Sequence, residues 1–119
     1  MGTKIAMKAK SSSGNPYDVY FEYDENQKKF TVFCTCQAGI HGKLCKHKIQ
    51  LLDGKASMLF DESDKPMLDQ VREWVQKSKY TELISEYAAV KKEIEALQKK
   101  EKAARKTLEV LLKNGIEVP

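Results

Sequence analysis

The sequence predicts an α+β protein: a small β-hairpin or β-sheet with a short helix, followed by a C-terminal, coiled-coil-like helical segment. Two observations favour this class. Between residues 17 and 35, aromatic and β-branched residues alternate with polar ones, as in β-strands with one face in water. From residue 83 onward, apolar residues recur at steps of four and three, as on a helix. We expect two domains, 1–60 and 61–119.

The first half contains the strand signals. Residues 17–23 and 30–35 predict a hairpin joined by a polar turn, and the weaker alternation in residues 4–10 predicts a further strand. Residues 37–43 contain two glycines and are expected to form an irregular loop. Residues 44–52 then predict a short helix, because Asp53-Gly54 supplies a typical helix stop.

The second half is predicted to be helical. Residues 55–62 fit either a strand or an extended connector. Ser63 or Asp64 can cap a helix that carries a proline in its first turn, and Ser78-Lys79 is a possible break. From Thr81 the helical pattern continues to Asn114-Gly115. The first of these helices has an apolar stripe formed by Met67, Leu68, Val71, Trp74 and Val75.

Composition and charge limit the possible classes. The chain has 119 residues, of which 32% are charged, so it buries little apolar surface and needs a further source of stability, such as a metal or oligomerisation. The net charge of +4 lies entirely in residues 1–60, which contain nine lysines and five acidic residues. No apolar run is long enough to span a membrane and no signal peptide is evident, so we expect a cytoplasmic protein, or a nuclear one in a eukaryote.

The cysteines and one histidine have the spacing of metal ligands. Cys34 and Cys36 are separated by one residue, as are Cys45 and His47, and eight residues connect the two pairs. Three thiolates and one imidazole complete the tetrahedral shell of a structural zinc ion (Zn2+). In a reducing compartment such clusters bind metal more often than they form disulfides. His41 is the alternative nitrogen ligand, and a cysteine nucleophile activated by a histidine is a further alternative.

Geometry favours a metal over a disulfide. At a strand end, residues i and i+2 point the same way with Cα atoms roughly 6.6 Å apart. A disulfide needs Cβ atoms about 3.8 Å apart, whereas zinc needs only the sulfurs to approach that closely. Cys45 and His47 cannot converge inside a regular helix, so we expect Cys45 just before the helix and His47 in its first turn.

The pattern Cys-x-Cys, loop, Cys-x-His, after an aromatic-rich strand and before an apolar helix, resembles the SWIM zinc finger. The resemblance covers roughly residues 17–54. It implies that Cys34, Cys36, Cys45 and His47 bind zinc, that a β-hairpin precedes a helix, and that the module contacts DNA or proteins. Many members have proline where this chain has Gln37, which changes only the loop. No ATPase or transposase part accompanies the motif, so no enzymatic activity is implied.

Four lysines surround these ligands in the sequence: Lys43, Lys46, Lys48 and Lys55. Three thiolates with one divalent cation leave one net negative charge, which the lysines can offset. Alternatively, they form a small basic face for the phosphates of a nucleic acid. No residue run specifies a groove-reading helix or a base preference.

Residues 83–111 carry a heptad stripe that predicts contact with another helix. The stripe can pair with a second copy to form a homodimer, in either orientation, or with residues 66–78 folded back within the chain. It contains Leu83, Tyr87, Val90, Ile94, Leu97, Glu101, Ala104, Leu108 and Leu111.

These observations favour a non-catalytic zinc-finger module that mediates protein–protein interaction and has a helical oligomerisation arm. The alternative is nucleic-acid binding through the basic face of the finger. A thiol redox sensor that releases zinc on oxidation requires only the same cysteines. The sequence does not separate the first two hypotheses.

Overall fold

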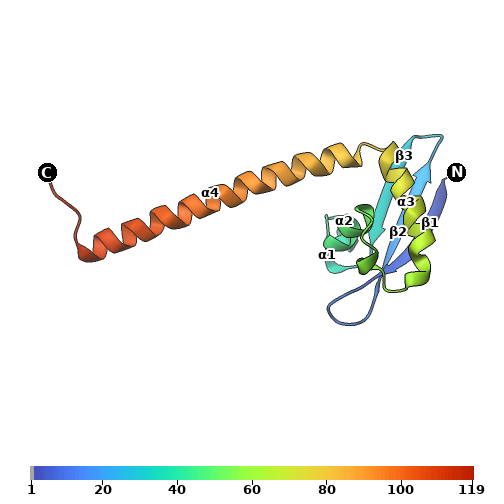
Figure 1. The fold of residues 1–119 in the computed structure, drawn as a ribbon, viewed down its shortest axis with the longest axis horizontal. Coiled ribbons are helices and arrows are strands. Elements are labelled where there is room, and N and C mark those ends of the chain that lie inside the picture. Colours follow the sequence, from blue (N-terminus) through green and yellow to red (C-terminus); the bar gives the residue numbers. More distant parts are fainter. Residues whose placement is uncertain (1) are drawn as a thin grey trace. The chain divides into compact units, whose positions relative to one another are not determined.

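The computed structural model describes residues 2–119, and its contacts group the chain into two units, Met1–Thr81 and Glu82–Pro119. The first unit combines a three-stranded sheet with short helices, and a long helix forms the second unit, so the predicted α+β class is confirmed (Figure 1). The elements are β1 (Thr3–Ala9), β2 (Tyr17–Asp24), β3 (Lys29–Cys34), α1 (Gln37–Ile40), α2 (Lys46–Leu52), α3 (Lys65–Lys77) and α4 (Tyr80–Asn114).

The sheet is antiparallel throughout, in the order β1-β2-β3. Strands β2 and β3 form the hairpin predicted for residues 17–23 and 30–35, and β1 is the further strand predicted for residues 4–10. Met7 pairs with Val19, which pairs in turn with Cys34, and all three side chains are buried on the inner face. The register therefore brings the first cysteine into the core.

Helix α3 covers part of this inner face. Its predicted apolar stripe is buried through Leu68, Val71, Trp74 and Val75. The Trp74 ring lies parallel to that of Tyr23, with centroids 5.6 Å apart, and meets Phe30 edge-on at 6.1 Å. These four residues of the stripe therefore belong to the core of the first unit.

Two predicted connections differ in the structure. Residues 37–43 were expected to form an irregular loop because they contain two glycines, but they begin with the short helix α1. Residues 55–62, for which the sequence left a strand and a connector open, contain 3₁₀ turns at Ala56–Met58 and Glu62–Asp64. Between these turns, Leu59 forms a bridge with Ala9, so the connection runs along the edge of β1.

Helix α2 ends as predicted. Asp53 is its C-cap, and Gly54 follows with φ +79°, a conformation that glycine adopts without strain. The Arg72 guanidinium of α3 donates a hydrogen bond to the Leu52 carbonyl, one of the carbonyls that lacks a partner within the helix. This contact fixes the end of α2 against α3.

Helix α4 follows a break at Ser78, the C-cap of α3, and Gly115 comes directly after its last residue with φ +116°. Every residue of 85–119 is exposed. Among the described residues, no helix combines the length and apolarity needed to cross a membrane. The predicted boundary between two domains at residue 60 stays a prediction. The contacts group α3 with the sheet in the first unit.

The Tyr80 hydroxyl is buried without a hydrogen-bond partner among residues 2–119. We expect Tyr80→Phe to match or exceed the wild-type free energy of unfolding, by up to about 1 kcal/mol, because the orphaned hydroxyl is costly to bury. Chemical denaturation at neutral pH measures this. Tyr20→Phe, on the exposed sheet face, is the matched control, and a clear loss of stability in Tyr80→Phe would contradict the expectation.

The pH dependence gives a second readout. Burial, reinforced by the negative charge of Asp53, raises the pKa of Tyr80 from 10.0 to about 12. The folded chain therefore resists ionisation of this phenol, so the free energy of unfolding is unaffected by the group below about pH 10 and falls as the pH rises from there towards 12. Tyr80→Phe should lack this part of the alkaline loss of stability.

Candidate metal centre

Four side chains from three consecutive segments converge at one end of the sheet. Cys34 is the last residue of β3, Cys36 is the N-cap of α1, Cys45 is the N-cap of α2, and His47 lies in the first turn of α2. Their candidate ligand atoms all lie within 4.8 Å of one another. The predicted placement of Cys45 before the helix and His47 inside it is confirmed. The arrangement can hold one metal ion.

Thr35 fixes the cysteine pair at the strand end. Its backbone N–H donates to the Asp18 carbonyl at 3.0 Å, and its Oγ1 accepts from the Asp18 N–H at 3.0 Å. Thr35 is therefore bound to β2, and the cysteines before and after it are held in place by that attachment. Both of these cysteines are buried.

Two of the sulfurs act as helix caps. The Gly39 N–H donates to Cys36 Sγ at 3.3 Å, and the Lys48 N–H donates to Cys45 Sγ at 3.5 Å. Backbone N–H groups that would otherwise lack partners at the helix starts thus point at sulfur. At Cys36 this contact favours the negatively charged thiolate, the form that binds metal.

Electrostatics differ between the two cysteines of the first pair. Burial raises the pKa of Cys34 to about 12. Burial pushes the pKa of Cys36 upward as well, but hydrogen bonds from the Gly39 N–H and from the neighbouring thiols lower it overall. A divalent cation reverses the penalty at Cys34, because a coordinated thiol is deprotonated. The cluster is therefore suited to a cation.

The environment of His47 points most clearly to a metal-binding role. Both ring nitrogens are buried, and neither has a hydrogen-bond partner within residues 2–119. Burial lowers the pKa of His47, and the positive charge of Lys46 lowers it further. The nearby Lys10 backbone acts in the opposite direction and raises the pKa, although it forms no hydrogen bond with the ring. A neutral buried imidazole without a partner costs about 1–3 kcal/mol, which metal coordination would remove.

Gly39 is a site residue that the sequence reasoning missed. A Cβ at this position would clash with the Cys34 carbonyl oxygen and would stand 2.8 Å from the Cys34 Cβ. Only glycine therefore lets α1 approach the end of β3 closely enough for Cys36 to reach the cluster. The available signal was a glycine three residues after the second cysteine.

The other candidate residues lie outside the cluster. His41, the alternative nitrogen ligand, is exposed at the C-cap of α1. Lys43, Lys46 and Lys55 are exposed, but Lys48 is only 8% exposed and its Nζ donates to the Lys43 carbonyl at 3.1 Å. The structure thus brings the four predicted ligands together and leaves three of the four lysines open to solvent.

The donor set defines what the site can bind. Three sulfurs and one imidazole nitrogen suit soft or borderline cations and fill a tetrahedral shell. The three cysteines are free of disulfides, so all three sulfurs are available as ligands. Comparisons with protein-family models, curated proteins and solved structures found no match to this chain.

Substitution of Gly39 should disrupt the site sterically. We expect Gly39→Ala to lower metal content well below one equivalent, because the methyl group separates α1 from β3. Gly42→Ala is the control: its Cβ would meet nothing within 4 Å, so only its φ of +71° costs stability, about 1 kcal/mol. Elemental analysis and thermal unfolding of both variants check this, and equal behaviour would contradict it.

Proposed function

We propose that this chain is a non-catalytic, zinc-binding module that docks a partner protein, with α4 as an oligomerisation arm. One observation carries the zinc assignment: four donors converge, and both nitrogens of the buried His47 lack partners. Zinc suits the three-sulfur, one-nitrogen set, and four protein ligands leave no open position for a reacting water. The resemblance to SWIM zinc fingers supports the same ion.

The charge around the cluster fits a structural role. A zinc ion with three thiolates and a neutral imidazole has one net negative charge. Lys48 is buried beside Cys45, to whose sulfur its N–H donates, and its ammonium group is held by the Lys43 carbonyl. The positive charge of Lys48 offsets the net negative charge of the zinc–thiolate centre. This supports the interpretation that Lys48 serves the metal centre and not a phosphate.

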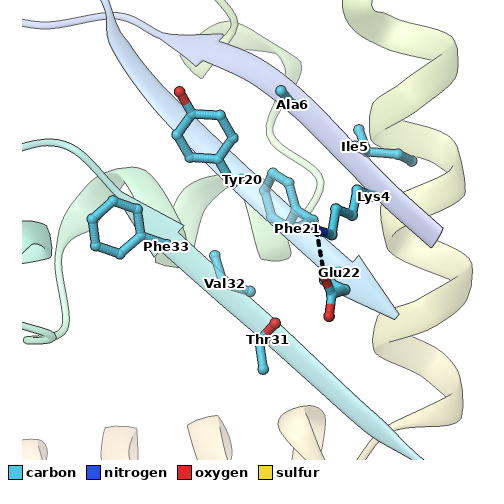
Figure 2. Close-up of a pocket in the computed structure, with 9 residues that line it drawn as sticks. All are labelled: Lys4, Ile5, Ala6, Tyr20, Phe21, Glu22, Thr31, Val32 and Phe33. Carbon is cyan, nitrogen blue, oxygen red and sulfur yellow. Dashed lines mark ion pairs between the residues drawn. The ribbon is translucent and has the colours of Figure 1, made fainter. Parts of the chain in front are cut away.

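The outer face of the sheet is the proposed docking surface. Ala6, Tyr20 and Phe33 form one cross-strand row, and the two aromatic rings are 46% and 45% exposed. Their centroids lie 6.3 Å apart at an interplanar angle of 25°. Figure 2 shows them beside a hollow of about 420 Å³ that spans the three strands. Exposed aromatic pairs of this kind are typical anchors of protein interfaces.

Charges on this face are paired. Lys4 lies 3.5 Å from Glu22, and Lys8 lies 3.2 Å from Asp18. The Lys4–Glu22 pair is visible at the edge of the hollow in Figure 2. An aromatic centre with balanced charges beside it favours a protein partner over a polyanion, which requires unpaired basic groups.

The alternative is nucleic-acid binding. Lys43, Lys46 and Lys55 remain exposed, and the outer aromatic rings can stack on unpaired bases. Three phosphate contacts would give a log–log salt slope of about −2.7 for duplex DNA. Titration of single- and double-stranded DNA at low salt separates the two functions: tight binding that Lys43→Glu and Lys46→Glu abolish would favour the alternative.

The zinc assignment predicts an equimolar metal content in the purified, untagged chain. We expect His47→Ala to lose the metal and His41→Ala to retain it, because only His47 lies in the cluster. Substitution of cobalt for zinc should produce the visible absorption of a tetrahedral thiolate site in wild type and His41→Ala. Less than half an equivalent of metal in the wild type, or retention in His47→Ala, would contradict the assignment.

Complete metal removal should unfold residues 17–54. A structural zinc contributes about 10–16 kcal/mol in finger peptides, which is comparable with the whole stability of a small domain. Circular dichroism and the emission of Trp74, which packs on Tyr23 from this region, report the loss. Unchanged spectra after chelation would show that the fold does not depend on the metal.

The docking surface is tested by a double variant, Tyr20→Ser with Phe33→Ser, compared with Thr31→Ser on the same face. Both outer rings are about half exposed, so we expect the metal content and the fold to survive. Cross-linking and mass spectrometry in source cells should recover a protein partner with wild type and Thr31→Ser, but not with the double variant. Recovery with all three chains would rule out this face as the docking surface.

A further inference from the structure

Helix α4 exposes a continuous apolar stripe. Its heptad positions from Leu83 to Leu111 follow one another at alternating steps of four and three, and eight of the nine are apolar. The large apolar side chains among them are 43–63% exposed, and no residue of α4 is buried. A stripe of this period and length is the surface that one helix offers to another in a coiled coil.

We propose that α4 pairs with α4 of a second copy of this chain in antiparallel orientation, centred between Glu95 and Ala96. This proposal specifies the partner and orientation of the oligomerisation arm in the proposed function. It rests on the side chains of α4 alone, so it stands or falls separately from the zinc and docking-surface assignments.

Parallel pairing places each heptad residue opposite its own copy. Glu101 would then face a second Glu101 in the apolar seam, where like charges without water repel strongly. Tyr87 would meet Tyr87, and Ala104 would meet Ala104, so one layer is crowded and another is underfilled. Lys100 would also lie beside Arg105 of the other helix, which adds a repulsive flanking pair.

Antiparallel pairing about residues 95 and 96 removes each of these conflicts. The largest residue of the stripe meets the smallest, because Tyr87 lies opposite Ala104, and Ile94 lies opposite Leu97, a residue of equal size. Leu83 lies opposite Leu108, so the ends of the overlap are apolar. The overlap spans residues 83–108, about 38 Å of helix. Every layer contains at least one apolar side chain.

Glu101 is accommodated in this arrangement. It lies opposite Val90 of the second helix instead of another carboxylate. Its own carboxylate accepts a hydrogen bond from the Arg105 guanidinium, one turn further along the same helix. Because that ion pair is already formed in the single helix, Glu101 can direct its charge out of the seam towards Arg105.

The flanking positions are also complementary. Glu93 of each helix lies beside Lys100 of the other, which gives two symmetry-related ion pairs per dimer. On the opposite side, Lys91 lies beside Gln98 and Ile84 beside Arg105, so no like charges meet. The antiparallel register thus has attractive pairs and no repulsive one, whereas the parallel register combines an attractive pair, Glu86 with Lys91, and the repulsive pair of Lys100 with Arg105.

Reversing the charge of Lys100 should change the dimer affinity in opposite directions in the two orientations. In the antiparallel dimer Lys100→Glu places one carboxylate beside each Glu93 and should weaken association about tenfold. In a parallel dimer the same change places Glu beside Arg105 and should strengthen it. The residues three and four positions from Lys100 on its own helix are Leu97, Ala96, Ala103 and Ala104, so the change disturbs no ion pair within the helix.

The experiment is sedimentation equilibrium of the full, metal-loaded chain. We expect wild type to dimerise, Lys100→Glu and Glu93→Lys each to weaken the dimer about tenfold, and the double variant to restore wild-type affinity. Lys92→Glu, on the outer helix face, is the control and should leave affinity unchanged. A wild-type monomer at high micromolar concentration, tighter association of Lys100→Glu, or failure of the double variant to recover would overturn the proposal.

Discussion

Three cysteine sulfurs and the His47 ring converge where the two shortest α-helices of the first unit begin. Helices α1 and α2 have four and seven residues, too few to be stable alone in water. Their caps, Cys36 and Cys45, are also members of the cluster. A bound cation would therefore fix both helix starts to the end of β3 at one point. Without a cation, the buried thiols and the imidazole, which has no hydrogen-bond partner among residues 2–119, lower the stability of the fold.

The rest of the first unit is arranged around that point. The sheet register buries Cys34 in the same row as Val19 and Met7, and α3 closes the other end of the inner face through Trp74. Lys48 is buried, and its ammonium group donates to the Lys43 carbonyl. On the outer sheet face the rings of Tyr20 and Phe33 are about half exposed within the first unit.

A short, polar chain buries little apolar surface, and the two units differ in how they are built under this constraint. The first adds a metal-binding cluster to a small core, whereas the second has no core and keeps its apolar residues on the surface of α4. A helix of that kind gains from a partner of matching shape and charge. In the proposed antiparallel pair, Tyr87 matches Ala104 in size and Glu93 matches Lys100 in charge, so a second copy of α4 would be such a partner.

The sequence by itself determined the features that depend on near neighbours: the strands from their two-residue period, α4 from its heptads, the end of α2 at Gly54, and the ligand set from the spacing of the cysteines and His47. Only the tertiary structure decided the approach of Gly39 to Cys34, the bridge from Leu59 to Ala9, the burial of Lys48 and the packing of α3 on the sheet. These depend on which surfaces meet in space, and local periodicity records which face of a segment is apolar without recording what that face packs against.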